Sequence, residues 1–80
     1  MIIVLLRKMA TGQKGIIRRV TASGELGRRI LDLGLVPGTP FQVQGRAPLK
    51  DPVAIRFRGF TLTLRNSESD FIEAEVEEVS

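Results

Sequence analysis

The stretch SGELGRRILDLGLVPGTPFQVQGRAP, residues 23–48, decides the fold of this 80-residue chain. It predicts a short helix, a helix stop, one strand and a proline-containing loop. Leu26, Ile30 and Leu33 recur at helical spacing and predict one buried stripe. The stretch contains neither histidine nor cysteine, so we expect a rigid structural unit without catalytic chemistry.

The predicted helix has a signal at each end. Ser23 can cap the first free amides of the helix. Gly34 stands where a left-handed residue ends a helix, which places Leu35 in contact with Ile30. Pro37 then prevents a restart of the helix.

Leu31 lies off the predicted buried stripe. At 100° per residue it points away from Leu26 and Ile30, while Arg28 and Asp32 share the outer face as an i, i+4 pair. Two interpretations stay open. Leu31 packs under a neighbouring loop, as flanking leucines often do, or it belongs to a docking surface.

Length and composition predict a single domain over residues 1–80, close to the size at which one core gives marginal stability. The chain has no cysteine, so no disulfide or thiolate metal site is available. The apolar residues 1–6 are too few to span a bilayer and have no basic segment before them. We expect this segment to be an edge strand and the chain to be cytoplasmic.

Charge is divided along the chain, whose net charge is +3. All 12 Lys and Arg lie in residues 7–65, while six of the nine acids lie in residues 68–78. Such asymmetry is typical of proteins that bind nucleic acid or an anionic surface. It also fits a barrel in which an acidic last strand lies beside a basic first one, pairing Arg18 and Arg19 with Glu73, Glu75 and Glu77.

Apolar and polar residues alternate downstream of the helix, which predicts one-sided strands at residues 41–44, 53–58 and 60–65. Arg58-Gly59 predicts a tight hairpin between the last two. The turn is type I′ if Arg58 accepts a positive φ, and a bulged turn is the alternative.

Three further segments complete the pattern. Residues 15–21 read as a bulged strand, 66–70 as a turn or a single helical turn, and 72–77 as the last strand. The fold class is therefore mainly β, a small closed or half-closed antiparallel barrel of five to six strands with one short inserted α-helix. Closure removes exposed edges, and the first and last strands then meet.

Several motifs together resemble the ferrous iron transport protein A (FeoA) family, over residues 6–76. The most specific are a helix stop of form LGL-x-PGT and, about ten residues later, APL-x-DP. The segments that carry the resemblance are Gly12 to Gly15, Ile17, Val20, Arg28 to Thr39, Ala47 to Val53, Arg58-Gly59 and Leu62 to Arg65.

The resemblance implies an SH3-like barrel that acts as a non-enzymatic cytoplasmic accessory of a FeoB-like membrane GTPase-transporter of ferrous iron, at the inner face of the membrane through that partner. The same module is similar to the C-terminal domain of iron- and manganese-dependent repressors, where it follows a helix-turn-helix domain. No such domain precedes it in this sequence, so we expect the accessory.

Metal binding and cofactor binding are not expected. Divalent iron prefers imidazole, carboxylate or thiolate donors, and the chain offers only carboxylates. Glu73, Glu75 and Glu77 could hold a hard cation weakly, but we expect a solvated acidic edge. The segment Gly12 to Gly15 is too short for a phosphate loop.

The alternative function is RNA binding. The segment from Gly12 to Val20 also resembles the start of KOW-type barrels, and Arg56 and Arg58 add outward positive charge. Single-strand binders usually offer aromatic platforms. Here three aromatic residues are predicted to point inward and one flanks a turn, which disfavours nucleic acid as a partner: Phe41, Phe57, Phe60 and Phe71.

We therefore predict a partner-binding face that joins the outer side of the helix to its stop and to the proline-containing loop. Its residues are Arg28, Arg29, Leu31, Leu35, Pro37, Pro48, Leu49, Lys50 and Asp51. Pro and Gly there also suit the turns themselves. A homo-oligomer formed through residues 2–6 stays open.

Overall fold

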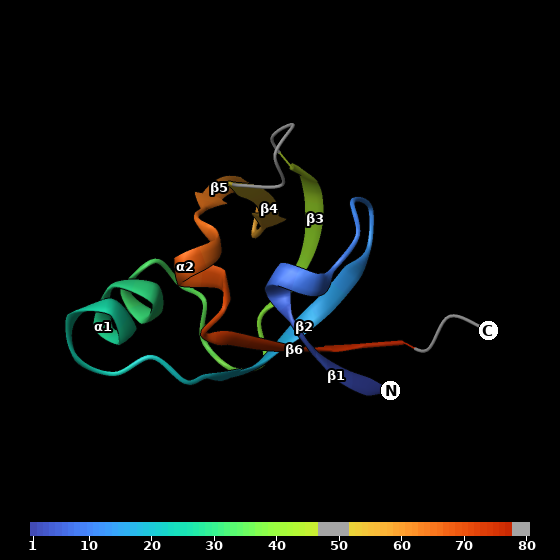
Figure 1. Ribbon diagram of the computed structural model, residues 1–80. Coiled ribbons are helices and arrows are strands. Elements are labelled where there is room, and N and C mark those ends of the chain that lie inside the picture. The colour runs from blue at the N-terminus through green and yellow to red at the C-terminus, as the bar shows by residue number, and fades with distance from the viewer. Residues whose placement is uncertain (47–51, 78–80) are drawn as a thin grey trace.

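The computed structural model describes residues 1–46 and 52–77. It contains one six-stranded antiparallel sheet in the order β1-β6-β2-β3-β4-β5, curled into a small SH3-like barrel (Figure 1). This confirms the predicted fold class. The strands are β1 Ile2–Leu5, β2 Lys14–Val20, β3 Pro40–Arg46, β4 Val53–Phe57, β5 Phe60–Leu64 and β6 Ile72–Val76; the helices are η1 Leu6–Lys8, α1 Gly24–Asp32 and α2 Asn66–Ser69.

The first and last strands pair, as predicted. β6 lies between β1 and β2, so that Glu75 faces Ile3 on one side and Ile16 on the other. β1 is an edge strand, as predicted, and β5 is the strand at the other edge. Glu73 lies opposite Arg19, but the ion pairs within residues 1–46 and 52–77 are elsewhere, and none joins β2 to β6. Of the predicted cross-strand charge pairs, the register of the described residues brings only Arg19 opposite Glu73, and no ion pair joins them.

The predicted bulge in β2 is confirmed. The pairing of β2 with β6 shifts register between Ile17 and Arg19. One residue is therefore unpaired there, and this bends the strand and increases its twist. A second shift lies in β3 between Val43 and Gly45. Such bends let a six-stranded sheet curl around one core.

The β4–β5 hairpin has the tight turn that the sequence predicted. Arg58 has a φ of 50° and Gly59 a φ of 81°, which is the type I′ arrangement, and Phe57 lies directly opposite Phe60. The inward position expected for Phe60 is wrong, because its side chain is 68% exposed. Phe60 follows the turn at the tip of an edge hairpin, beyond the cover that buries its cross-strand partner Phe57.

One hydrophobic core fills the barrel and extends under α1. Its buried members come from every strand except β1, from η1, from α1 and from the segment after α1. They are Leu6, Met9, Ile17, Ile30, Leu35, Phe41, Val43, Val53, Ile55, Phe57, Leu64, Ile72, Ala74 and Val76. In the described part of the chain, no helix is both long and apolar enough to cross a membrane.

Candidate protein-docking surface

Helix α1 stands at one end of the molecule, away from β1 (Figure 1). Ile30 is fully buried and fixes the inner side of the helix to the core. Gly27 is also buried, and a Cβ added there would lie 2.4 Å from the carbonyl oxygen of Ala22. The helix therefore packs directly against the backbone that precedes it, and its outer side is held in a fixed position.

The end of α1 is a Schellman motif, as predicted. The Gly34 amide donates to the Leu31 carbonyl at 2.9 Å, and the Leu35 amide donates to the Ile30 carbonyl at 3.3 Å. Gly34 has a φ of 98°. The hydrophobic contact of Leu35 with the core then closes the helix end.

The start of α1 differs from the prediction. Ser23 occupies the cap position, but its side chain makes no capping hydrogen bond. The next residue, Gly24, has a φ of 64° and departs from the regular first turn that a capping hydroxyl requires. Glycine, rather than serine chemistry, sets the beginning of this helix.

Hydrogen bonds tie the segment after α1 to the sheet. The Thr39 hydroxyl donates to the Gly34 carbonyl at 3.2 Å. The Gly38 amide donates to the Ile17 carbonyl at 2.7 Å, and the Ile17 amide donates to the Thr39 carbonyl at 2.9 Å. Because these bonds join the stop to β2, Pro37 is exposed on a rigid turn rather than on a mobile loop.

The outer side of α1 presents one leucine and exposed charge. Leu31 is 42% exposed, so its predicted position off the buried stripe is confirmed. It lines a shallow depression that runs along one side of the helix, together with Ala22, Ser23, Gly24, Gly27, Arg28 and Asp32. Because Gly24 and Gly27 have no side chains, the surface beside Leu31 is hollowed. Arg28 is exposed at the rim of this depression.

Arg29 has a partner that the sequence did not predict. Its guanidinium lies 3.5 Å from a carboxylate oxygen of Glu68 in α2, and the Arg29 side chain is still 68% exposed. Glu68 also accepts a hydrogen bond from the Arg65 amide at 3.0 Å. The pair links the two helices across the surface. No short-range sequence signal indicates it, because the partners are far apart in the chain.

Two leucines at the end of α1 differ from the prediction in their burial. Leu33 was predicted to complete the buried stripe, but it is 37% exposed because the chain leaves the helix there. Leu35 was predicted to lie on the partner-binding face and is instead fully buried, packed in the core through the Schellman turn. Leu35 is therefore removed from that face.

The described part of the predicted face consists of Arg28, Arg29, Leu31 and Pro37, all exposed. Pro48, Leu49, Lys50 and Asp51 lie outside the described residues. We call the four described residues the α1 face. The structure brings Arg28, Arg29 and Leu31 together on one helix of nine residues.

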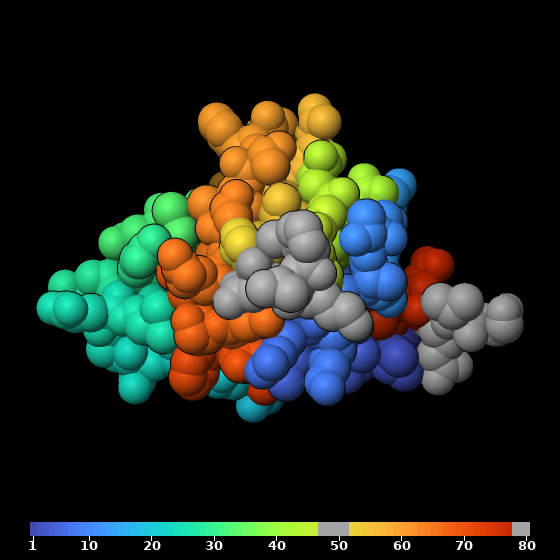
Figure 2. Space-filling view, turned by 45° about the horizontal axis from the view of Figure 1, so that its top comes forward, coloured from blue at the N-terminus to red at the C-terminus, as the bar shows by residue number. Residues whose placement is uncertain are grey.

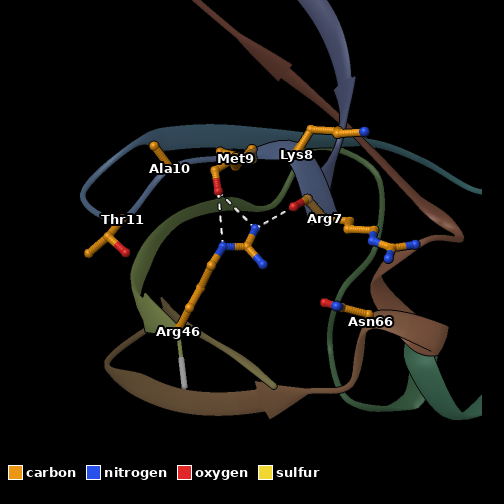
Figure 3. Close-up of a pocket in the computed structure, with 7 residues that line it drawn as sticks. All are labelled: Arg7, Lys8, Met9, Ala10, Thr11, Arg46 and Asn66. Atoms are coloured by element: carbon orange, nitrogen blue, oxygen red, sulfur yellow. Dashed lines mark hydrogen bonds between the residues drawn. The ribbon is translucent and has the colours of Figure 1, made fainter. Parts of the chain in front are cut away.

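A hollow beside η1 is built around Arg46 (Figure 3). The Arg46 guanidinium points at η1 and donates to three carbonyls: that of Leu6 at 3.1 Å, that of Arg7 at 2.6 Å and that of Met9 at 2.8 Å. The end of β3 is thereby fixed to η1, so the role visible for this arginine is structural. Arg7 itself pairs with Asp70 at 3.1 Å.

Carboxylates do not gather into a cation site in the part of the chain that the structure describes. No group of three or more acids there could hold a metal ion together. Glu73 and Glu75 alternate along β6, opposite Leu5 and Ile3 of the edge strand.

Comparison with known proteins identifies relatives of this chain. The family model of the FeoA domain matches residues 4–76. A curated relative from Porphyromonas gingivalis, a Fe(2+) transport protein A/Fe(2+) transporter FeoB fusion protein, is 37% identical over 71 residues. The match covers 89% of this chain and spans only 8% of that relative's length.

Solved structures share the fold. The NMR structure of a FeoA-like protein from Clostridium acetobutylicum aligns with a TM-score of 0.88 and 33% identity, over 98% of this chain and 91% of that one. A manganese-dependent transcriptional repressor aligns with a TM-score of 0.84 over 94% of this chain and 42% of that one. At 16% identity, the second likeness shows a common fold alone.

Proposed function

This chain belongs to the FeoA family, and we propose that it serves ferrous iron transport as a non-enzymatic accessory that binds a FeoB-type membrane GTPase-transporter and regulates it. The observation that carries the proposal is the Porphyromonas gingivalis fusion protein, in which a relative of this chain and such a transporter form one polypeptide. Fusion raises the effective concentration of one module for the other. Where the two modules are separate polypeptides, association requires a surface that replaces the covalent link.

The α1 face has the properties of such a surface. Arg28 and Arg29 extend from a helix whose two ends are fixed, so little conformational freedom is lost when they bind. Guanidinium groups bind carboxylates through forked, charge-assisted hydrogen bonds. Leu31, which is exposed and lines the shallow depression, adds an apolar side chain that a partner can cover. We therefore expect an acidic surface on the transporter that accommodates one leucine.

Retention of the purified transporter by this chain, immobilised on beads, tests the proposal. We expect Arg28→Glu to lower retention by at least tenfold, because it reverses the charge at the rim of the face. Lys14→Glu is the matched control, since it makes the same charge change on β2, at another exposed position. Arg29 is replaced by Gln rather than Glu, because a glutamate there would face Glu68.

Leu31→Ala separates docking from folding. An exposed leucine of this kind should cost less than about 1.5 kcal/mol of unfolding free energy when truncated, whereas Ile30→Ala in the core should cost about 2–5 kcal/mol. We expect Leu31→Ala to weaken retention while its urea midpoint stays near that of the unchanged chain. If Arg28→Glu and Leu31→Ala both retain as much transporter as Lys14→Glu does, the α1 face is not the binding surface. Salt-sensitive retention on RNA in place of the transporter would support the alternative function.

A further inference from the structure

The tip of the β4–β5 hairpin exposes an aromatic ring among positive charges. Phe60 is 68% exposed, against 40% for Phe71 and less than a tenth for the other two phenylalanines. Arg58 in the turn is exposed, and so is Arg56, which lies on the other face of the hairpin, opposite Thr61. Residues 53–65 hold three arginines and no acid. Figure 2 shows the orange atoms of this hairpin projecting at the top of the molecule.

The hairpin is anchored at its base and uncovered at its tip. Along β5 the inward residues pass from exposed Phe60 through half-buried Leu62 to fully buried Leu64. The type I′ turn at Arg58-Gly59 holds the two strands in register up to their last pair, Phe57 with Phe60. The exposed ring is therefore presented on a rigid element and does not require a loop to become ordered.

We propose that this tip contacts an anionic lipid bilayer, with the Phe60 ring at the boundary of the acyl chains and Arg56 and Arg58 at the lipid phosphates. Charge complementarity carries the choice of occupant, because the tip has only positive charges and anionic lipids attract them. An exposed aromatic ring next to basic residues is the pattern of segments that bind at membrane interfaces. A projecting tip reaches a bilayer without needing a groove shaped to receive it.

Single-stranded RNA fits the tip less well than lipid does. Binders of that kind stack successive bases on several aromatic platforms along a positively charged groove. The hairpin exposes one aromatic ring, since Phe57 opposite it is buried. One ring can insert at a lipid interface, but it provides only a single stacking site for RNA, fewer than such binders use.

The tip adjoins the end of the α1 helix. A Cβ added at Gly34 would lie 3.4 Å from the ring of Phe57, so the helix stop contacts the base of the hairpin tip. Lipid contact by two arginines and one ring is weak by itself. On a membrane that also holds a protein partner, it would act as a second contact, and linked contacts raise overall affinity. The lipid contact needs no transporter, so it can be tested separately from the proposed function.

The chain contains no tryptophan and no tyrosine, so Phe60→Trp introduces a single fluorescent reporter at the proposed contact. We expect its emission to shift to shorter wavelength with phosphatidylglycerol vesicles and to be quenched when the acyl chains are brominated. Phosphatidylcholine vesicles should give neither change. Phe71→Trp is the matched control, because Phe71 is also exposed but follows Asp70.

Charge variants of the chain with Phe60 retained test the role of the arginines. The measurement is the fraction of protein that floats with the same vesicles. Asparagine in Arg58→Asn tolerates the positive φ of this position. Arg56→Gln removes the charge with little change to the strand, because the side chain is exposed. Each should lower the vesicle partition constant, obtained from the bound fraction over a range of lipid concentrations, about fivefold, the effect of about 1 kcal/mol per basic residue near an anionic surface. Phe60→Ser should also lower it, while Lys14→Gln on β2 should not.

Absence of quenching by brominated phosphatidylglycerol in Phe60→Trp, or equal quenching in Phe71→Trp, would overturn the proposal. So would a spectral shift that single-stranded RNA produces and phosphatidylglycerol vesicles do not, because it would assign the tip to RNA. Unchanged flotation of Phe60→Ser with its melting temperature retained would contradict the role of the ring.

Discussion

Gly27 shows how a single residue is fixed by a contact that the sequence does not display. In a helix interior, glycine is destabilising by about 1 kcal/mol relative to alanine, so the sequence offers no local reason for it. The structure supplies the reason, because the backbone of Ala22 passes where a side chain would stand. Phe60 is the opposite case, an aromatic residue at a core-facing position that the end of the hairpin leaves uncovered.

We predict that Gly27→Ala destabilises the protein despite the better helix propensity of alanine. A Cβ would lie 2.4 Å from the Ala22 carbonyl oxygen, and a backbone atom cannot move as a flexible side chain can. Overpacking of this kind costs about 1–3 kcal/mol, and the gain in propensity offsets up to about 1 kcal/mol of it. Urea unfolding followed by circular dichroism measures the loss.

Gly45→Ala is the control for that measurement, because nothing lies within 4 Å of a Cβ added at Gly45. Its unfolding free energy should stay within about 0.5 kcal/mol of the unchanged chain. A similar loss in both variants would show that glycine flexibility, rather than the Ala22 contact, determines the effect. A more stable Gly27→Ala protein would contradict the close packing of α1.

At the scale of elements, local signals predicted well and long-range contacts did not. Gly34 and the Arg58-Gly59 turn were predicted because each needs only its own residues and a positive φ. The Arg29–Glu68 pair and the burial of Leu35 depend on how α1 docks, which no window of sequence contains. Of the residues predicted for the partner-binding face, the three on α1 are exposed and Leu35 is buried.

Arg46 is the clearest contact between elements that the sequence left unassigned. Its guanidinium joins the end of β3 to three carbonyls of the η1 segment, those of Leu6, Arg7 and Met9. Figure 3 shows the bonds to Arg7 and Met9. A planar group with several donors can satisfy divergent carbonyls at once, and an ammonium group on a flexible stem cannot reproduce that fork. The arginine therefore supplies hydrogen-bond donors to the η1 segment, as a neighbouring strand does for the carbonyls of a strand in the barrel.

We predict that Arg46→Lys lowers the unfolding free energy by about 1–3 kcal/mol, the cost of losing charge-assisted hydrogen bonds to partly buried carbonyls. The total charge stays the same, so the effect reports geometry. Arg56→Lys on β4 makes the same exchange at an exposed position and should change stability by less than about 0.5 kcal/mol. Amide hydrogen exchange at Met9 should accelerate in Arg46→Lys alone. Equal stability of the two variants would show that the three carbonyl contacts contribute nothing.

At the scale of the whole molecule, the strand order explains the divided charge. The acidic β6 lies between β1 and β2, so the negative end of the sequence occupies the middle of one half of the sheet. Arg56 of β4 and Arg58 of the following turn lie on the other half, at the hairpin tip. Sequence predicted that the first and last strands meet, but the full order follows from β-bulges and from packing around one core, which alternation alone does not determine.

The same arrangement predicts that this chain does not take up the metal it is proposed to help transport. Outward carboxylates on β6 are spaced by two residues, about 6.5–7 Å along a strand, whereas bound cations need several oxygens at about 2.0–2.6 Å. Glu73 and Glu75 would have to converge against their mutual repulsion. We expect 1 mM ferrous ion, without oxygen, to raise the melting temperature by less than about 1 °C, because a dissociation constant near 10 mM gives only about 0.06 kcal/mol of stabilisation.

A dissociation constant near 10 µM would instead give about 2.7 kcal/mol and a rise of about ten degrees or more, so the two cases are readily separated by differential scanning fluorimetry. Glu73→Gln with Glu75→Gln is the control, since it removes the carboxylates of β6 and keeps their size. A saturable rise that this double variant abolishes would establish a cation site on β6. It would also replace the view that the acids of this strand are solvated and that the chain acts on iron transport only through its partner.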